Sequence, residues 1–353
     1  MLRSITSRVN RPRADAGVAM VSVKDVAAAA SVSVGTVSNV LNQPERVSAR
    51  TVERVQRVIQ ELGFVRNDAA RQLRAGRSRS IGLVVPDIGN PFFAEVVRGA
   101  EDRAADAGMT VLLGNSDERD ERQLAHLELF QEQRVNGVLL TPASDDLSAV
   151  HRFAAGGMPV ILVDREVEEG LLPSVSVDDV EGGRLAAEHL LASGRRTLAF
   201  VGGPQSVHQV ADRLRGVQAA VAEHPDATLE IFEQSALTVL QGRAAGEAIA
   251  ARSADARPDA VFAANDLLAV GLLQAFSFGS AIRVPDDIAM VGYDDIDFAS
   301  ATVVPLSSVR QPARLLGWTG VDLLLKELDG LEHDRRVRFQ PELVVRESSS
   351  GGA

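Results

Sequence analysis

From about residue 80 onward the chain alternates short apolar runs with helical stretches, and this alternation restricts it to an α/β fold. The apolar runs are too short for helices and lack polar alternation, so they predict buried parallel strands with helices on both faces. They lie at 81–85, 111–113, 138–140, 160–163, 198–201, 260–263 and 288–291. Helices are expected near 92–107, 120–134, 146–155, 180–193, 208–222, 239–251, 266–278 and 312–329. Two such series predict two doubly wound parallel-sheet lobes with a ligand cleft between them.

Polar or turn residues follow most of these predicted strands. Open parallel sheets bind ligands at the carboxyl ends of their strands, so we expect these segments to meet at one cleft. A sugar offers alternating hydroxyl donors and acceptors and an apolar ring face, which amides, carboxylates, guanidinium groups and an aromatic wall complement. Asn265 and Asp266 also precede a predicted helix, and we assign capping mainly to Asp266 and ligand contact to Asn265. The segments are 86–93, 164–165, 213–216, 264–266, 292–295 and 310–312.

A different pattern occurs at residues 22–47, which favour two short helices on either side of a turn. Ser22 and Asp25 have the spacing of a capping box at the first helix, and Ser33 can cap the second. The apolar residues of the second helix then lie on one side, which leaves small and polar residues at its exposed N-terminal end. A DNA recognition helix requires this layout. The alternative is a plain helical hairpin within a core.

The charge of the chain is divided unevenly. Residues 1–80 hold 14 Lys and Arg against 6 Asp and Glu, a net charge of +8, and since the whole chain carries −11, the remainder carries −19. A basic head on an acidic body is expected of a DNA-binding unit attached to a small-molecule sensor. The acidic body would also repel a DNA duplex, which confines contact to the head.

Several other classes of protein are disfavoured. No apolar run is long enough to cross a bilayer and the first 20 residues lack the apolar core of a secretory signal, so we expect neither a membrane partner nor export. The absence of Cys fits a reducing cytoplasm, and no His pair has ligand spacing, so no metal or other cofactor is expected.

An enzyme is not expected either. The signature motifs of phosphate-binding loops, serine hydrolases, zinc proteases and dinucleotide-binding folds are absent. Asp164 and Asp294 offer a carboxylate pair of the kind used in glycoside hydrolysis. Arginine beside these carboxylates is expected to hold them ionised, which removes the general acid.

The sequence resembles the LacI family of bacterial transcriptional regulators from residue 22 to about residue 346. Residues 25–42 match its headpiece signature, and Asn67, Ala70 and Leu73 match the NxxAxxL pattern of its hinge helix. The resemblance implies an effector-responsive regulator, expected to be a repressor, that binds a pseudo-palindromic operator as a homodimer. The implied organisation is a disordered or spurious extension at 1–19, a helix-turn-helix headpiece at 20–66, a hinge helix and linker at 67–80, a two-lobed effector-binding core at 81–346 and a disordered tail at 347–353. By the same analogy, the chain crosses between the lobes near 164, near 295 and after about 325.

The resemblance also implies how DNA is contacted. Thr36 and Ser38 are expected to contact phosphates or the backbone. Val34 would touch a thymine methyl and Asn39 would pair with adenine. Leu73 would wedge between base steps in the minor groove and kink the duplex. The complete set of expected DNA-binding residues is Ser33, Val34, Gly35, Thr36, Ser38, Asn39, Asn67, Ala70 and Leu73.

The implied ligand residues suit a sugar or sugar derivative. They are Asn90, Phe92, Phe93, Asp164, Arg165, Arg213, Asn265, Asp294 and Gln311. Leu237 is expected where relatives place an aromatic residue, which weakens one stacking wall and leaves the identity of the sugar open. A nucleobase-responsive regulator is the alternative, as is a sugar-binding receptor of the transport type, which would carry a signal peptide and no headpiece.

Overall fold

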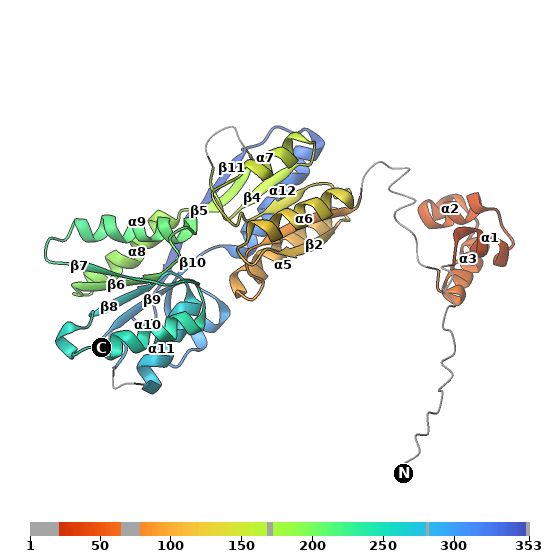
Figure 1. The fold of residues 1–353 in the computed structure, drawn as a ribbon. Coiled ribbons are helices and arrows are strands. Elements are labelled where there is room, and N and C mark those ends of the chain that lie inside the picture. The colour runs from red at the N-terminus through yellow and green to blue at the C-terminus, as the bar shows by residue number, and fades with distance from the viewer. Residues whose placement is uncertain (1–20, 65–77, 168–171, 280–281, 351–353) are drawn as a thin grey trace, which may run out of the picture. The chain divides into compact units, whose positions relative to one another are not determined.

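The computed structural model describes residues 21–64, 78–167, 172–279 and 282–350, and the chain divides into two compact units between Gly76 and Arg77 (Figure 1). The predictions for the extension at 1–19 and for Asn67, Ala70 and Leu73 lie outside the described residues. Within the described ranges, no helix has the length and apolar character needed to cross a bilayer.

The first unit is a small bundle of helices. It consists of α1 (Val23–Ala29), α2 (Val34–Asn42), the short 3-10 helix η1 (Pro44–Arg46) and α3 (Ala49–Leu62). The predicted capping box at Ser22 and Asp25 is confirmed, and the Ser33 hydroxyl accepts a hydrogen bond from the Thr36 amide at 3.0 Å. Val26, Val37 and Val55, one from each α-helix, are fully buried against one another in its core. These residues explain why short helices of modest propensity hold together.

The first lobe of the second unit is built on a six-stranded parallel sheet. Its strand order is β11-β5-β4-β3-β1-β2 (Figure 1). The strands are β1 (Ser80–Val85), β2 (Thr110–Asn115), β3 (Val138–Leu140), β4 (Val160–Val163), β5 (Ser174–Val177) and β11 (Arg336–Phe339). The helices are α5 (Pro91–Asp106), α6 (Asp120–Glu132), α7 (Ser148–Ala155) and α12 (Ala313–Asp329).

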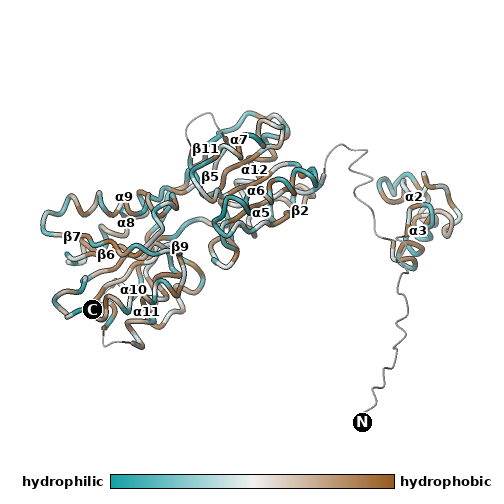
Figure 2. The backbone as a smooth tube through the Cα atoms, in the orientation of Figure 1, coloured by the Kyte–Doolittle hydropathy of each residue, from teal (hydrophilic) through white to brown (hydrophobic). Residues whose placement is uncertain are grey.

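Alternate side chains of β1 explain why this sheet carries helices on both faces. Ile81, Leu83 and Val85 pack into one apolar cluster with α5 and α12. Val84 points the other way and packs with α6 and α7. The continuous apolar run is therefore buried on both sides, as predicted for a parallel strand. Figure 2 shows hydrophobic residues on central strands of both lobes.

The second lobe repeats the plan with strand order β12-β10-β9-β8-β6-β7. Its neighbours are parallel except for β12, which runs antiparallel to β10. The strands are β6 (Thr197–Gly202), β7 (Thr228–Glu233), β8 (Ala260–Ala263), β9 (Ala289–Asp294), β10 (Ser307–Arg310) and β12 (Glu342–Val344). The helical elements are α8 (Asp179–Ala192), α9 (His208–Ala222), α10 (Val239–Ala250), η2 (Ala254–Ala256), α11 (Asp266–Gly279) and η3 (Asp297–Ala301).

Glycine allows the helices α8 and α9 to pack in close contact. A Cβ atom on Gly183 would lie 2.0 Å from the Arg213 carbonyl oxygen, and one on Gly216 would lie 2.0 Å from the Val180 carbonyl oxygen. No side chain fits at such separations, so the two backbones touch where each helix presents glycine. This contact sets the position of Arg213, which projects from α9.

The chain crosses between the lobes at places that differ from the predicted ones. The first crossing follows β5 at residue 177, because β5 pairs with β4 in the first sheet, so the prediction near 164 is wrong. The second crossing follows β10 at residue 310 rather than 295, since β10 pairs with β9 in the second sheet. The third runs from β11 to β12, between residues 339 and 342, in keeping with a crossing after about 325.

Two predicted boundaries also need correction. The linker was expected to reach residue 80, but Ser80 is the first residue of β1 and pairs with Thr110. The tail was expected to be disordered from 347, but Ser348 and Ser349 are buried. Ser348 donates to the Met290 carbonyl at 2.7 Å and accepts from the Ser307 amide at 2.8 Å. A serine-rich end can be ordered because each hydroxyl both donates and accepts.

Deleting residues 347–353 is therefore expected to destabilise the second lobe. The deletion leaves the buried Ser307 amide and the Met290 carbonyl without the Ser348 hydroxyl, and each such loss costs about 1–3 kcal/mol. Urea unfolding checks this, with a chain that lacks only 351–353 as the matched control. Equal unfolding free energies for both truncations would contradict the structural role of Ser348.

Candidate functional site

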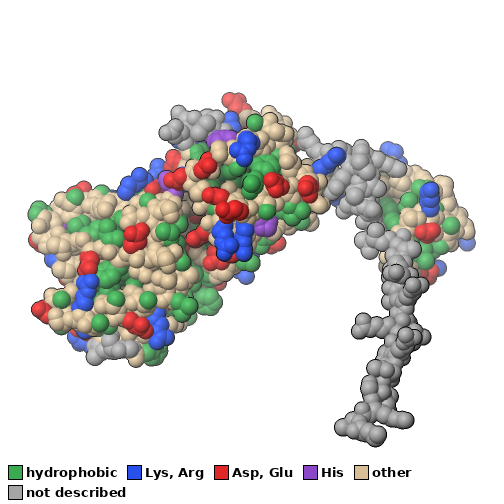
Figure 3. Space-filling model, viewed as in Figure 1, with side chains coloured by type: hydrophobic (Ala, Val, Ile, Leu, Met, Phe, Trp, Pro, Cys, Tyr) green, Lys and Arg blue, Asp and Glu red, His purple; other side chains and the backbone are tan. Residues whose placement is uncertain are grey.

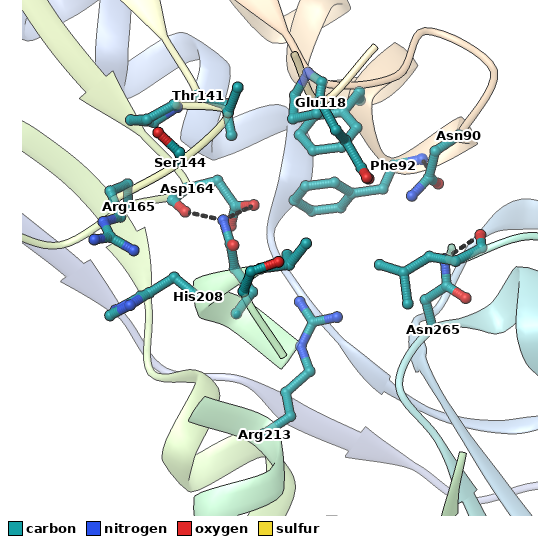
Figure 4. A pocket seen from close by; sticks show the side chains of 18 of the residues that line it. Asn90, Phe92, Glu118, Thr141, Ser144, Asp164, Arg165, His208, Arg213 and Asn265 are labelled. Atoms are coloured by element: carbon teal, nitrogen blue, oxygen red, sulfur yellow. Dashed lines mark hydrogen bonds between the residues drawn. The ribbon is translucent and has the colours of Figure 1, made fainter. Parts of the chain in front are cut away.

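All predicted ligand residues except Gln311 line one cleft between the two lobes of the second unit. From the first lobe they are Asn90, Phe92, Phe93, Asp164 and Arg165, and from the second they are Arg213, Asn265 and Asp294. Leu237 also lines the cleft, as predicted. Figure 4 shows Phe92 and Arg213 entering the cavity from opposite lobes. The carboxyl ends of the strands thus come together from segments far apart in the sequence.

Asn90 and the two phenylalanines form the apolar side of the cleft. The Asn90 side-chain oxygen accepts from the Phe92 amide at 3.0 Å and so caps α5. The Asn90 side-chain NH2 group remains a donor, and it favours the ionised form of the Asp294 carboxyl. Phe92 and Phe93 meet edge to face with ring centroids 5.0 Å apart, and both are nearly buried. The cap fixes the start of the helix, and the helix in turn fixes the aromatic wall.

Arg213 is held by three contacts that leave part of its guanidinium facing the cleft. Its Nε donates to Asp179 at 2.8 Å and its Nη1 donates to the Ala264 carbonyl at 2.7 Å. The guanidinium carbon lies 3.6 Å from the centre of the Tyr293 ring. Nη2 lies 4.0 Å from an Asp294 oxygen and can reach a ligand between them. The side chain is therefore oriented before any ligand arrives.

Asp164 directly follows β4 and Asp294 is the last residue of β9, and both have unusual backbone conformations. Their φ angles are 58° and 102°, in the region that residues other than glycine rarely adopt. Gln209 from the second lobe donates to an Asp164 carboxylate oxygen at 3.0 Å, which joins the two lobes across the cleft (Figure 4). Backbone strain of this kind concentrates at functional sites.

Gln311 does not line this cleft, although the resemblance implied that it contacts ligand. Its Nε2 donates to Asp294 at 2.8 Å, and both side chains are buried. It borders a neighbouring hollow together with Asp295 and Pro312. Gln311 therefore orients Asp294 from behind, because β10 brings it alongside the end of β9.

Arg165 contacts a partner within its own lobe. It forms an ion pair with Asp145 at 2.6 Å, and its side chain is largely buried. His208, at the start of α9, lies 3.9 Å from the same carboxylate. Arg165 and His208 lie on the side of the cleft opposite Asn265 (Figure 4).

The capping assignment for Asn265 and Asp266 is wrong. Asn265 caps α11, since its oxygen accepts from the Leu268 amide at 2.9 Å. Asp266 instead accepts from the Ile296 amide at 2.9 Å and from the Ser308 hydroxyl at 2.7 Å. It is fully buried and ties α11 to β10 and to the segment that follows β9. Asn265 therefore has two roles, because it also lines the cleft.

Burial raises the pKa of both cleft carboxyls. Arg213 was expected to hold Asp164 and Asp294 ionised, but burial raises the pKa of Asp164 well above its usual range and Asp179 and Asp294 raise it further. Burial also raises the pKa of Asp294 to about 6, even though Arg213, Gln311 and Asn90 favour its ionised form. Burial outweighs the single guanidinium because three carboxyls share it.

Sequence reasoning missed several residues of the cleft. Glu118 lies in it beside Phe92, and burial raises the pKa of its carboxyl (Figure 4). Thr141 and Ser144 follow β3, a correctly predicted strand whose polar end was overlooked. Gln209 lies four residues before Arg213, one helical turn away on α9. The rule that pointed to the other strand ends would have found Thr141.

The candidate DNA-binding residues of the first unit lie at the start of α2. The Val34 side chain is 41% exposed, and Gly35 and Asn39 are also exposed. The Thr36 hydroxyl lies 2.9 Å from that of Ser33. The Asn42 side chain donates to the Ser38 carbonyl at 2.9 Å. The Ser33–Thr36 bonds fix the first turn of α2, and the Asn42–Ser38 bond lies in its last turn. Val34 and Asn39 stay exposed for an external partner.

Two family models match the chain. The model described as bacterial regulatory proteins, lacI family, matches residues 22–67, and that described as a periplasmic binding protein-like domain matches residues 187–349. A ribose operon repressor from Halalkalibacterium halodurans is 34% identical over 336 residues, which cover 94% of this chain and 98% of the relative. A PurR transcriptional repressor from Photobacterium profundum is 32% identical over 333 residues, which cover 93% and 98%.

Solved structures agree with these relatives. The lac repressor dimer bound to operator and the anti-inducer ONPF is similar with a TM-score of 0.80 and 29% identity, and the match covers 94% of this chain and 99% of that one. A LacI family regulator from Enterococcus faecium with bound ribose has a TM-score of 0.70 and 28% identity, with 78% of this chain and 100% of that one covered.

Proposed function

Because the chain belongs to the LacI family of bacterial regulatory proteins, we propose that it represses transcription as a dimer and that a sugar or sugar derivative in its cleft controls operator binding. It is a DNA-binding transcriptional regulator and not an enzyme, since its relatives over nearly the whole chain are repressors. The observation that carries the effector assignment is Arg213, whose guanidinium is fixed by Asp179 and Ala264 and faces buried carboxyls across the cleft.

Chemistry of the cleft favours a polyol. Arg213, Asp164, Asp294, Asn90 and Asn265 offer donors and acceptors on several sides, and Phe92 offers one apolar wall. Sugars are bound by this combination of forked polar groups and a single stacking surface. Leu237 faces the cleft where a second aromatic ring would enclose a flat base.

A nucleobase effector is the second candidate, and it is favoured by the PurR relatives. A planar base gains most of its affinity from stacking and from hydrogen bonds along one edge. The cleft supplies one aromatic wall and several carboxyl groups, which suit the hydroxyl groups of a sugar better than a planar base. The effector screen described below distinguishes the two.

The dimer is proposed from the edges of the two sheets. The strands β2 and β7 each form an edge, and Leu112, Leu113 and Ile231 on them are exposed. Exposed apolar side chains along edge strands favour pairing with another chain. On the face shown in Figure 3, acidic and basic side chains are interspersed elsewhere on the core, as on ordinary solvated surfaces.

Regulation follows from motion of the lobes. In the operator complex, two α2 helices would enter successive half-sites of the major groove, with Val34 and Asn39 against the bases. Closure of the cleft around the effector would change the separation of the two hinge segments of a dimer, which biases their pairing in the minor groove. An effector acts in this way only if it binds one lobe arrangement more tightly than the other.

Leu73→Ala is expected to weaken operator binding far more than binding to random DNA. A side chain that wedges between central base steps acts only at the operator, whereas phosphate contacts act on any duplex. Titrations with operator and scrambled duplexes at one salt concentration measure both affinities. Arg71→Ala is the matched control, for which we expect similar losses on both duplexes. Similar losses for Leu73→Ala would show that Leu73 is only a packing residue.

A thermal-shift screen of pentoses, hexoses, sugar phosphates and nucleobases tests the effector assignment. A ligand at about 100 times its dissociation constant stabilises the protein by about 2.7 kcal/mol, which raises the melting temperature measurably. We expect an uncharged monosaccharide or derivative to give the largest shift. A response confined to nucleobases would overturn the sugar assignment in favour of the second candidate.

A further inference from the structure

Among the described residues, Asp164 forms no ion pair, unlike the neighbouring Asp179 and Asp294. Asp179 accepts from Arg213 Nε at 2.8 Å, and Asp294 lies 4.0 Å from Arg213 Nη2 and accepts from Gln311. Asp164 Oδ2 accepts only from the neutral amide of Gln209, and its Oδ1 is buried with no hydrogen-bond partner among the described residues. An ionised carboxylate in this position would be a buried charge without compensation.

The groups around Asp164 add to this cost. Asp179 faces it from α8, Asp294 from the end of β9, and Arg213 from α9. The neighbouring Arg165 is engaged by Asp145, with His208 close to the same carboxylate. Glu118 adds another carboxyl on the first-lobe side of the cleft. Three buried aspartates therefore face one guanidinium, and the excess of negative charge is smaller when one of them is neutral.

We propose that Asp164 is a neutral carboxylic acid at neutral pH in the empty cleft and that its Oδ1–H donates a hydrogen bond to an oxygen of the effector. The protonation is a property of the unliganded protein, and the donation rests on the function proposed above. Asp294 remains the charged acceptor, because Arg213 and Gln311 both favour its ionised form. The raised pKa of Asp164 agrees with the geometry.

This arrangement favours an uncharged effector over an anionic one. With Asp164 neutral, Asp179 and Asp294 still exceed the single charge of Arg213, so an anionic group in the cleft is repelled. Uncharged polyols are expected to bind more tightly than their phosphates or the corresponding sugar acids. Above the pKa of Asp164, binding must also take up one proton. The ionised Asp164 carboxylate, a proton and the effector then combine into a complex in which Asp164 is neutral.

Spectroscopy of the unliganded full-length protein tests the protonation directly. Infrared spectra at neutral pH are expected to contain a carboxylic acid carbonyl band that Asp164→Asn removes, because asparagine matches the shape of the neutral acid but has no such group. Burial also raises the pKa of Asp266, so only the part of the band that Asp164→Asn removes is assigned to Asp164. If Asp164→Asn removes no acid band, the inference is overturned, whatever becomes of the proposed function.

The pH dependence of binding tests the donation, with D-ribose as the probe. For the wild type, the dissociation constant is expected to be constant between the pKa of Asp294, about 6, and the pKa of Asp164, and to rise about tenfold per pH unit above the latter. Asp164→Asn should change less than about twofold over the same range, since an amide does not titrate there. Asp286→Asn is the matched control, an exposed aspartate outside the cleft, and should keep the wild-type profile.

The infrared experiment and the binding experiment test separate parts of the proposal, and each can fail without the other. A pH-independent wild-type affinity for D-ribose, or a pH-dependent one in Asp164→Asn, overturns donation by Asp164. Calorimetry of the wild type in buffers of different ionisation enthalpy checks proton uptake without any variant. If D-ribose does not bind at any pH, its choice as effector fails, and the infrared experiment still decides the protonation.

Discussion

Arg213→Ala is expected to lower the free energy of unfolding by about 3–5 kcal/mol, because it leaves a buried carboxylate, Asp179, without its cation. The Ala264 carbonyl would lose its donor as well. Effector affinity should fall at least tenfold, since a hydrogen bond from a charged group contributes about 1.5–3 kcal/mol. Operator binding by folded protein should persist, because the headpiece has a core of its own.

Urea unfolding and calorimetry with the effector found in the thermal screen measure the two effects. Arg215→Ala is the matched control: it lies two residues away on α9, its side chain is 60% exposed, and its ion pair with Asp212 is on the surface. Surface pairs contribute about 0–1 kcal/mol, so this variant should differ little from the wild type. Equal losses of stability in Arg213→Ala and Arg215→Ala would contradict the buried role of Arg213.

Gly216→Val should separate α8 from α9 and weaken effector binding through the backbone. The Cβ atom of the new valine would lie 2.0 Å from the Val180 carbonyl oxygen, so the helices must move apart. Overpacking of a core costs about 1–3 kcal/mol and more where backbone has to shift. The distance between Arg213 and Asp179 would lengthen with it, because each side chain belongs to one of the two helices.

Ala219→Val is the control for this substitution, since Ala219 is exposed on the same helix. It should cost less than about 0.7 kcal/mol, the range of ordinary helix propensities. Melting temperatures and effector affinities of the two variants give the comparison. A Gly216→Val protein with wild-type affinity would show that the close approach of the helices does not position Arg213.

The sequence predicted the strands that consist of continuous apolar runs and missed strands in which polar residues are buried. β5 reads Ser-Val-Ser-Val, and both serines are buried, so its pattern resembles that of a half-exposed strand. The first lobe crossing, which family analogy placed near 164, follows this strand at residue 177. β12 has three residues and an antiparallel neighbour, and its pairing depends on the chain returning from the other lobe.

The residues that line the site were predicted better than the pKa values of their carboxyl groups. The order of strand and polar end along the chain indicated Asn90, Asp164, Arg213 and Asp294, because parallel strands end at a common edge. The raised pKa of Asp164 was not predicted, since it depends on how many carboxyls share Arg213 and on how deeply they are buried. Neither property is encoded by spacing along the chain.

The double role of the two cleft asparagines determines where new effector specificities can arise. Asn90 and Asn265 each cap a helix through the side-chain oxygen and also line the cleft, so a substitution that alters recognition also removes a cap, at about 1 kcal/mol. Leu237 and Ser144 line the same cleft without capping a helix. A laboratory selection for a different inducer should therefore accumulate changes at Leu237 and Ser144 first and leave the asparagines in place.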